Sequence, residues 1–125
     1  MNQKPLVIVD GAHNEDAAKS LAKTLALYFG MKKVTFIVGI FADKEYEKIL
    51  EITCPFAEKV YCIETENPRA LPSKKLAKVA RRYVDDVVEA KSVEQALALG
   101  MLEQKKVFVA FGSLSFLGEV YHFFS

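Results

Sequence analysis

An acid and a histidine lie three residues apart directly after the first apolar run, in the segment Asp10-Gly11-Ala12-His13-Asn14. A carboxylate at such a place accepts hydrogen bonds from a ribose or positions a cation, and an imidazole hydrogen-bonds a phosphate or a carboxylate. Gly11 permits a sharp turn, and Asn14 is suited to cap the following helix. Two interpretations stay open from the residues alone. Asp10 and His13 face a shared binding crevice, or Asp10 is only a cap and His13 an exposed loop residue.

Three later loops also carry polar groups that suit an anion. In the first, we expect Asp43 to cap a helix and Lys44 to reach across the crevice. In the second, Arg69 follows a Pro-fixed turn and presents a bidentate partner for a carboxylate or phosphate, unless it is simply solvated at the surface. In the third, Gly112 and Ser113 form a corner whose amides and hydroxyl either bind an anion or cap a helix.

The motifs that the chain lacks narrow the chemistry further. The sequence has no Gly-x-x-x-x-Gly-Lys-Ser/Thr loop, no Gly-x-Gly-x-x-Gly fingerprint and no Gly-x-Ser-x-Gly elbow. Any phosphate chemistry must therefore be shared with another domain. Cys54 and Cys62 do not have metal-ligand spacing, so we predict no metal site and two reduced thiols.

Composition excludes other classes of partner. Lys and Arg number 17 against 16 for Asp and Glu, so there is no basic field to bind nucleic acid. With 51% hydrophobic and 26% charged residues, 125 residues are enough for one folded domain. The chain contains neither a run of 18 apolar residues nor a signal-peptide pattern, which predicts no membrane partner and a cytoplasmic location.

Short apolar runs that alternate with helical patterns must position these loops. Runs rich in β-branched and aromatic residues predict buried strands at 6–9, 34–38, 60–63 and 107–111, with a weaker strand at 87–88 and a cap at Ser92. The alternation predicts an α/β fold, a Rossmann-like three-layer α/β/α sandwich with a mainly parallel sheet of five or six strands. Ligands bind beyond the carboxyl ends of such strands, where the four loops meet. The helical apolar positions are Ala17, Leu21, Leu25 and Tyr28; Tyr46, Ile49 and Leu50; Leu76, Val79, Ala80 and Tyr83; and Val93, Ala96, Leu97 and Met101.

Taken together, the four loops resemble the carboxy-terminal domain of folylpolyglutamate synthase/dihydrofolate synthase, of the Mur ligase superfamily. The resemblance covers nearly the whole chain, and the first segment is the most specific. Its segments are Asp10-Gly11-Ala12-His13-Asn14, Gly39-Ile40-Phe41-Ala42-Asp43-Lys44, Glu66-Asn67-Pro68-Arg69-Ala70 and Phe111-Gly112-Ser113-Leu114.

The resemblance implies an ATP-dependent ligase that adds L-glutamate to folates or to dihydropteroate. In that superfamily ATP phosphorylates a carboxylate, and the amine of the incoming amino acid attacks the acyl phosphate. Residues 1–125 would form one glutamate-ligase domain, and the amino-terminal P-loop ATPase domain, which mainly binds ATP and Mg, is absent from this sequence. We therefore expect the chain to be inactive without that partner domain.

The resemblance also implies roles for individual residues. Asp10 matches a nucleotide-binding aspartate, and His13 matches a catalytic position that, like Ser113, is associated with glutamate and the reacting phosphate. Arg69 is similar to an arginine that holds the carboxylate of the amino acid in some Mur ligases. The supporting loop residues are Gly11, Asn14, Asp43 and Lys44.

Two other interpretations were compared with this one. A cell-wall Mur ligase would use the same chemistry on another acceptor, but the complete Asp-Gly-Ala-His-Asn string favours the folate branch. A receiver-like signalling module shares the doubly wound sheet. It needs clustered acids after the first strand, an Asp after the third and a Lys after the fifth, whereas these places hold Asp10 alone, Glu64 and Ser113.

Overall fold

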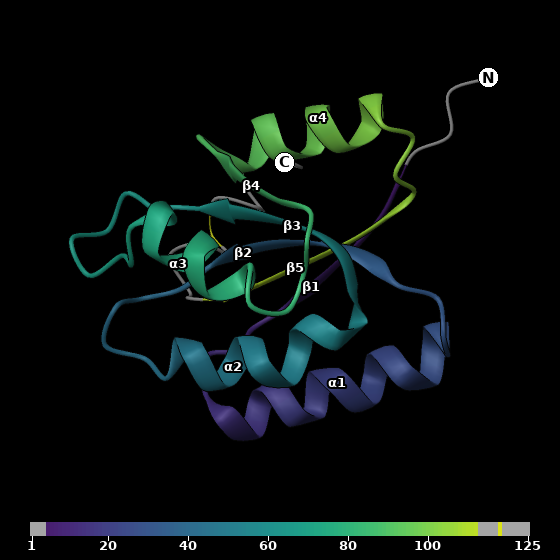
Figure 1. Cartoon of the computed structure of the whole chain (residues 1–125), viewed down its shortest axis with the longest axis horizontal. Helices are drawn as coiled ribbons and strands as arrows, with labels where there is room; N and C mark the ends of the chain where they lie inside the picture. The colour runs from purple at the N-terminus through teal and green to yellow at the C-terminus, as the bar shows by residue number, and fades with distance from the viewer. Residues whose placement is uncertain (1–4, 113–117, 119–125) are drawn as a thin grey trace.

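The computed structural model describes residues 5–112 and residue 118, so the prediction for Ser113 lies outside the described part. Strands and helices alternate along the chain, as the apolar patterns predict (Figure 1). The elements are β1 (Leu6–Asp10), α1 (Glu15–Phe29), β2 (Val34–Gly39), α2 (Tyr46–Thr53), the 3-10 turn η1 (Cys54–Phe56), β3 (Ala57–Ile63), α3 (Ser73–Ala80), β4 (Val87–Ala90), α4 (Val93–Leu102) and β5 (Val107–Gly112).

The described strands form one parallel sheet in the order β1-β5-β2-β3-β4. The predicted mainly parallel sheet of five or six strands is therefore confirmed, with five. The last strand in sequence lies between the first two, so β5 pairs with β1 on one side and with β2 on the other. This insertion brings segments a hundred residues apart to the same sheet edge.

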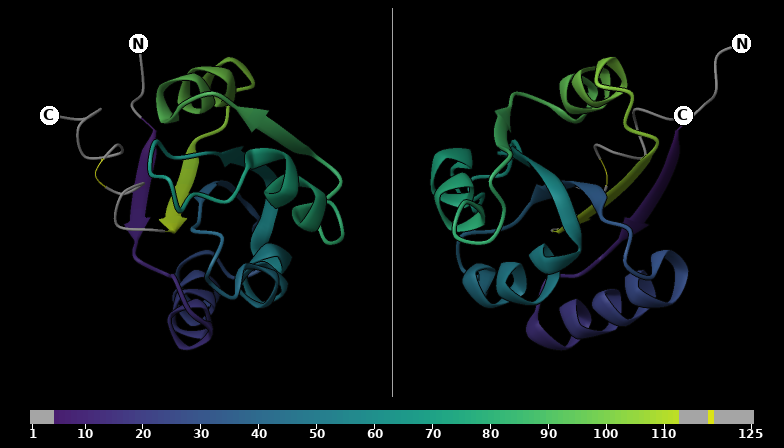
Figure 2. Two further views of the ribbon diagram at one scale, coloured as in Figure 1. Left: turned by 90° about the vertical axis from the view of Figure 1, so that its left-hand side faces the viewer. Right: turned by 45° about the vertical axis from the view of Figure 1, so that its right-hand side comes forward.

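Helices cover both faces of the sheet, which confirms the three-layer sandwich. α1, α2 and α3 pack on one face, where their apolar side chains join those of β2 and β3 in the larger core. α4 packs alone among the described helices on the other face, over Ile37, Tyr61 and Phe108 (Figures 1 and 2). It comes so close to the sheet at Gly100 that a Cβ there would lie 2.4 Å from Cε1 of Phe108.

The helix faces agree with the predicted pattern except near their carboxyl ends. Leu21, Leu25, Ile49, Leu50, Leu76, Val79, Ala80, Val93, Ala96 and Leu97 are buried, and Ala17 and Tyr46 are partly buried. Tyr28, Tyr83 and Met101 are exposed, so their assignment to the buried faces is wrong. Tyr28 and Met101 lie in the last turn of their helices and Tyr83 follows the end of α3, where the face in contact with the sheet has ended.

Local caps and the cysteines follow the sequence closely. Ser92 Oγ accepts a hydrogen bond from the amide of Gln95 at 3.0 Å, which confirms the predicted cap of α4. Cys54 and Cys62 are both buried free thiols. Within the described residues, no helix has the length and apolar character needed to cross a bilayer.

Candidate functional site

The carboxyl ends of β1, β5 and β2 lie next to one another and form the floor of the candidate site. Asp10 ends β1 opposite Phe111, and Gly39 ends β2 opposite Gly112. The chain leaves both β1 and β2 toward the face that α1 and α2 cover. Ligands of doubly wound sheets bind beyond the carboxyl ends of the strands.

The loop from Asp10 to Asn14 crosses this edge in a fixed conformation. Ala12 is fully buried and anchors the loop, while Asp10 is partly buried and His13 exposed. Asn14 Oδ1 accepts a hydrogen bond from the amide of Ala17 at 2.8 Å, which confirms Asn14 as the cap of α1. Since Asn14 supplies the cap, the Asp10 carboxylate is not needed for that role.

A short hydrogen bond orients the His13 ring. Its Nδ1 lies 2.6 Å from the carbonyl oxygen of Gly11. Because a carbonyl oxygen only accepts hydrogen bonds, Nδ1 carries the proton in this contact. Nε2 is therefore the ring nitrogen that remains for a ligand, as an acceptor in the neutral ring and as a donor in the imidazolium.

The structure brings together two predicted site residues that are 26 positions apart. Arg69 Nη2 donates to Asp43 Oδ2 at 2.5 Å, and the guanidinium carbon lies 4.6 Å from the centroid of the Phe41 ring. The hydrogen bond from Arg69 is the main reason that the pKa of the Asp43 carboxyl is lowered. Phe41 was not singled out from the sequence, since an aromatic residue after a strand has no distinctive pattern.

The prediction that Asp43 caps a helix is wrong. Glu45 occupies the cap position of α2, and no side chain there accepts a capping hydrogen bond. If Asp43 were the cap, α2 would begin at Lys44, but it begins two residues later. Residues 42–44 instead form a turn, closed by a hydrogen bond from the Lys44 amide to the Phe41 carbonyl at 3.2 Å. Asp43 is thus available to pair with Arg69.

Backbone hydrogen bonds join the loop after β2 to the loop after β3. The Ala42 amide donates to the Arg69 carbonyl at 2.7 Å, and the Leu71 amide donates to the Ile40 carbonyl at 2.9 Å. Within the turn, Asn67 Oδ1 accepts from the Arg69 amide at 2.9 Å. Two of these hydrogen bonds hold the Arg69 backbone, and the third joins the two loops beside it.

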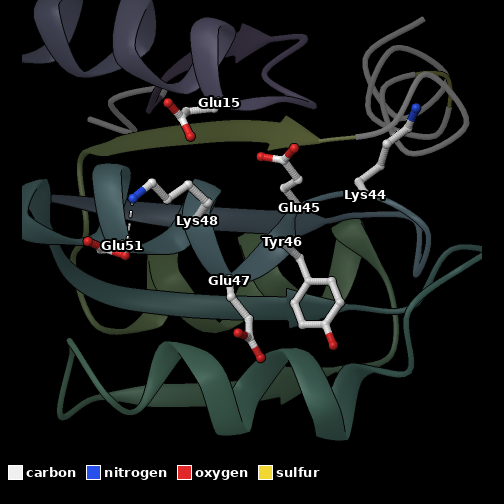
Figure 3. Close-up of a pocket in the computed structure, with 7 residues that line it drawn as sticks. All are labelled: Glu15, Lys44, Glu45, Tyr46, Glu47, Lys48 and Glu51. Carbon is white, nitrogen blue, oxygen red and sulfur yellow. Dashed lines mark ion pairs between the residues drawn. The ribbon is translucent and has the colours of Figure 1, made fainter.

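A cavity of about 460 Å³ lies beside these loops, between the beginnings of α1 and α2. Its charged lining is mixed, with one ion pair between Lys48 and Glu51 at 3.9 Å. Figure 3 shows the Lys44 side chain pointing away from Lys48 and Glu51. The lining residues are Glu15, Lys44, Glu45, Tyr46, Glu47, Lys48 and Glu51.

Sequence comparison decides the family. The chain matches the family model described as Mur ligase, glutamate ligase domain, over residues 1–114. The chain belongs to this family. Membership in the Mur ligase glutamate ligase domain family favours the ligase interpretation over a receiver-like signalling module.

Relatives of this Mur ligase glutamate ligase domain have names from folate metabolism. The dihydrofolate synthase/folylpolyglutamate synthase of Mycobacterium tuberculosis is 32% identical over 99 residues, which are 78% of this chain and 20% of the relative. The folylpolyglutamate synthase of Lacticaseibacillus casei is 36% identical over 73 residues, 58% of this chain and 17% of the relative. The chain thus spans about a fifth of the length of these relatives.

Solved structures agree with the family assignment. A folylpolyglutamate synthase from Mycobacterium tuberculosis, complexed with ADP and AMPPCP, matches with a TM-score of 0.84 and 25% identity, over 95% of this chain and 29% of that one. A folylpolyglutamate synthase from Thermotoga maritima matches with a TM-score of 0.77 and 30% identity, over 94% of this chain and 27% of that one. Each is similar to this chain over only part of its own length.

Proposed function

We propose that this chain is the glutamate-binding domain of an ATP-dependent ligase that adds L-glutamate to folates or to dihydropteroate. It would act with a P-loop ATPase domain, which would hold most of the ATP and the Mg. The observation that carries the proposal is that the Asp10–Asn14 loop and the Asp43–Arg69 pair both follow carboxyl ends of strands in one parallel sheet, in a chain of this family. The folate names of its relatives support the choice of acceptor.

The reaction requires two anions and an amine to meet. A phosphoryl group moves from ATP to the acceptor carboxylate, the glutamate nitrogen then attacks the carbonyl carbon, and the bond from that carbon to the phosphate oxygen breaks as phosphate leaves. The nitrogen loses its proton in the same sequence. Donors and cations fixed in place before the reaction stabilise the charge that develops.

Each proposed site residue has a task in this scheme. Arg69 would hold a carboxylate of glutamate by its guanidinium, and His13 would meet glutamate or the reacting phosphate through Nε2. Asp10 would orient the nucleotide and stay chemically unchanged. Gly11, Asn14, Asp43 and Lys44 would support these loops, and Ser113 keeps the glutamate role that the family resemblance implies.

Magnesium binding is not assigned to this chain. The described residues contain no group of three or more His, Cys, Asp or Glu side chains placed to hold a metal ion. No step above depends on a metal ligand from this chain. We keep the cytoplasm as the proposed location, because both cysteines are free thiols.

The test is to join this chain to the P-loop ATPase domain of a folylpolyglutamate synthase and measure ATP-dependent incorporation of labelled L-glutamate into a folate. We expect incorporation in the joined protein and none in the isolated chain. His13→Ala, Asp10→Ala and Arg69→Ala should each lower kcat/KM about 100-fold or more, as removal of an aligned hydrogen-bonding group does in other active sites.

The matched control is Glu58→Gln, which removes a carboxylate from an ion pair with Lys105 at the start of β3, the opposite edge of the sheet. It should leave incorporation unchanged. Near wild-type activity in the His13 and Asp10 variants would show that the assigned site is wrong. Ligation to a peptidoglycan precursor but not to folates would refute the proposed acceptor.

A further inference from the structure

Arg69 is restrained more strongly than an exposed arginine usually is. More than half of its side-chain surface is exposed, at 54%, and Asp43 is similar at 56%. An isolated pair with this exposure orders two long side chains for little gain in free energy. Here the Arg69 backbone is held by Ala42 and Asn67, and the Phe41 ring covers one face of the guanidinium.

The contact with Asp43 leaves most of the guanidinium available. Asp43 Oδ2 meets Nη2, whereas a guanidinium has five N–H donors distributed over three nitrogens. A second carboxylate can therefore bind through the Nε or Nη1 side while Asp43 stays in place. One arginine can bind two carboxylates in this manner, provided that another positive group balances the charge of the second carboxylate.

The chemistry of an amino acid supplies that balance. In the zwitterion, the α-carboxylate and the α-ammonium group are attached to the same carbon atom, so a site that holds the carboxylate also has the ammonium close by. An arginine beside an aspartate matches both charges, whereas a plain dicarboxylate would place an uncompensated negative charge next to Asp43. The Asp43 carboxyl stays ionised for this role, since Arg69 lowers its pKa.

We propose that Asp43 is a specificity-determining residue, which holds the Arg69 guanidinium and selects an amino acid that has an ammonium group over a dicarboxylate that lacks one. The inference rests on the proposed function, because Arg69 must be the carboxylate ligand. Phe41 is a positioning residue in this site, acting only through Arg69.

The experiment compares two ligands that differ in the ammonium group. L-glutamate and glutarate are titrated separately into the 125-residue chain, and binding is followed by NMR. The wild-type chain should bind L-glutamate more tightly than glutarate. Asp43→Asn should weaken L-glutamate about threefold or more while glutarate binds as well as before or better, so that the preference for glutamate falls.

A control variant distinguishes a role of Asp43 in ligand selectivity from a role in holding Arg69 in place. Glu58→Gln removes the same charge from an ion pair with Lys105 at the other end of the strands, and it should leave the preference unchanged. Equal weakening of both ligands in Asp43→Asn would overturn the specificity role, as would an unchanged preference. Failure of both ligands to bind the wild-type chain would also overturn it. The proposed function is judged separately by glutamate ligation in the joined enzyme, so the two failures are distinguishable.

Discussion

Gly112 and Gly39 approach each other so closely that a Cβ on Gly112 would lie 1.8 Å from the Gly39 carbonyl oxygen. The two residues are register partners at the carboxyl ends of β5 and β2. Gly112 also has a φ of 140°, which side chains rarely permit. The floor of the candidate site therefore consists of bare backbone at this point, and no side chain can be added to it without movement of the strands.

Gly112→Ala should destabilise the fold strongly. Both the backbone strain and the clash with Gly39 act in the same direction, so we expect a loss of about 2 kcal/mol or more in the free energy of unfolding. Urea denaturation followed by circular dichroism measures it. Gly30→Ala is the matched control, because Gly30 also has a positive φ, 60°, but nothing in the described part of the chain lies within 4 Å of its Cβ position. Its cost should be about 1 to 3 kcal/mol, from backbone strain alone, and the loss in Gly112→Ala should exceed it. Equal losses in the two variants would contradict the steric argument.

Asn14→Ala should weaken α1 and the loop before it. The variant removes the side-chain oxygen that accepts from the Ala17 amide, which leaves one amide of the first turn without its partner. We expect a loss of about 1 kcal/mol in the free energy of unfolding, measured in urea. Asn14→Asp retains an acceptor at the same place and should restore most of the stability. If it is as unstable as Asn14→Ala, the cap is not the cause.

A buried lysine joins β3 to the end of α4 at the sheet edge opposite the candidate site. Lys59 is 4% exposed, and its ammonium lies 2.6 Å from Glu103 Oε2 and 3.3 Å from Asp86 Oδ2. Burial lowers the pKa of Lys59, but the hydrogen bonds to Glu103 and Asp86 outweigh it, and the pKa is raised overall. In turn, the hydrogen bond from Lys59 is the largest cause of the lowered pKa of Glu103.

Lys59→Met should change the response of stability to acid. In the folded wild-type chain the Glu103 pKa lies below its usual value of 4.5. The ionised Glu103 carboxylate therefore stabilises the fold above pH 4.5, and this contribution is lost as the pH falls through the lowered pKa of the folded state. Without Lys59, the part of the acid-induced loss in the free energy of unfolding that comes from Glu103 should shrink. At pH 7 the free energy of unfolding of the variant should stay within about 1 kcal/mol of wild type, since methionine fills the buried space. Urea midpoints between pH 7 and pH 3 measure the effect. The same acid sensitivity in both proteins would contradict it, and Lys48→Met is the control because its pair with Glu51 lies at the exposed surface.

Both cysteines should resist modification in the folded chain. Burial raises the pKa of Cys54 and of Cys62 to about 12, so almost no thiolate is present at pH 8. Alkylation by iodoacetamide at pH 8 should therefore be about 100-fold or more slower in buffer than in guanidinium chloride, as measured by mass spectrometry. Rapid labelling of the native chain at either residue would mean that the core opens there.

The sequence alone determined the features that depend on near neighbours. Apolar runs identified the strands, and Asn14 and Ser92 identified two helix starts, because each cap bonds an amide only three residues away. The family resemblance rested on the same local strings, and membership in the family is now established. The roles of Asp10, His13, Arg69 and Ser113 remain predictions.

Only the tertiary structure decided which distant residues meet. Insertion of β5 between β1 and β2 places Gly112 against Gly39, and no local pattern specifies that strand order. The same holds for Asp43, whose spacing suggested a helix cap but whose partner is Arg69, across two loops. Local periodicity reflects the geometry of a single helix or strand, whereas pairing across the sheet depends on how all the elements pack at once.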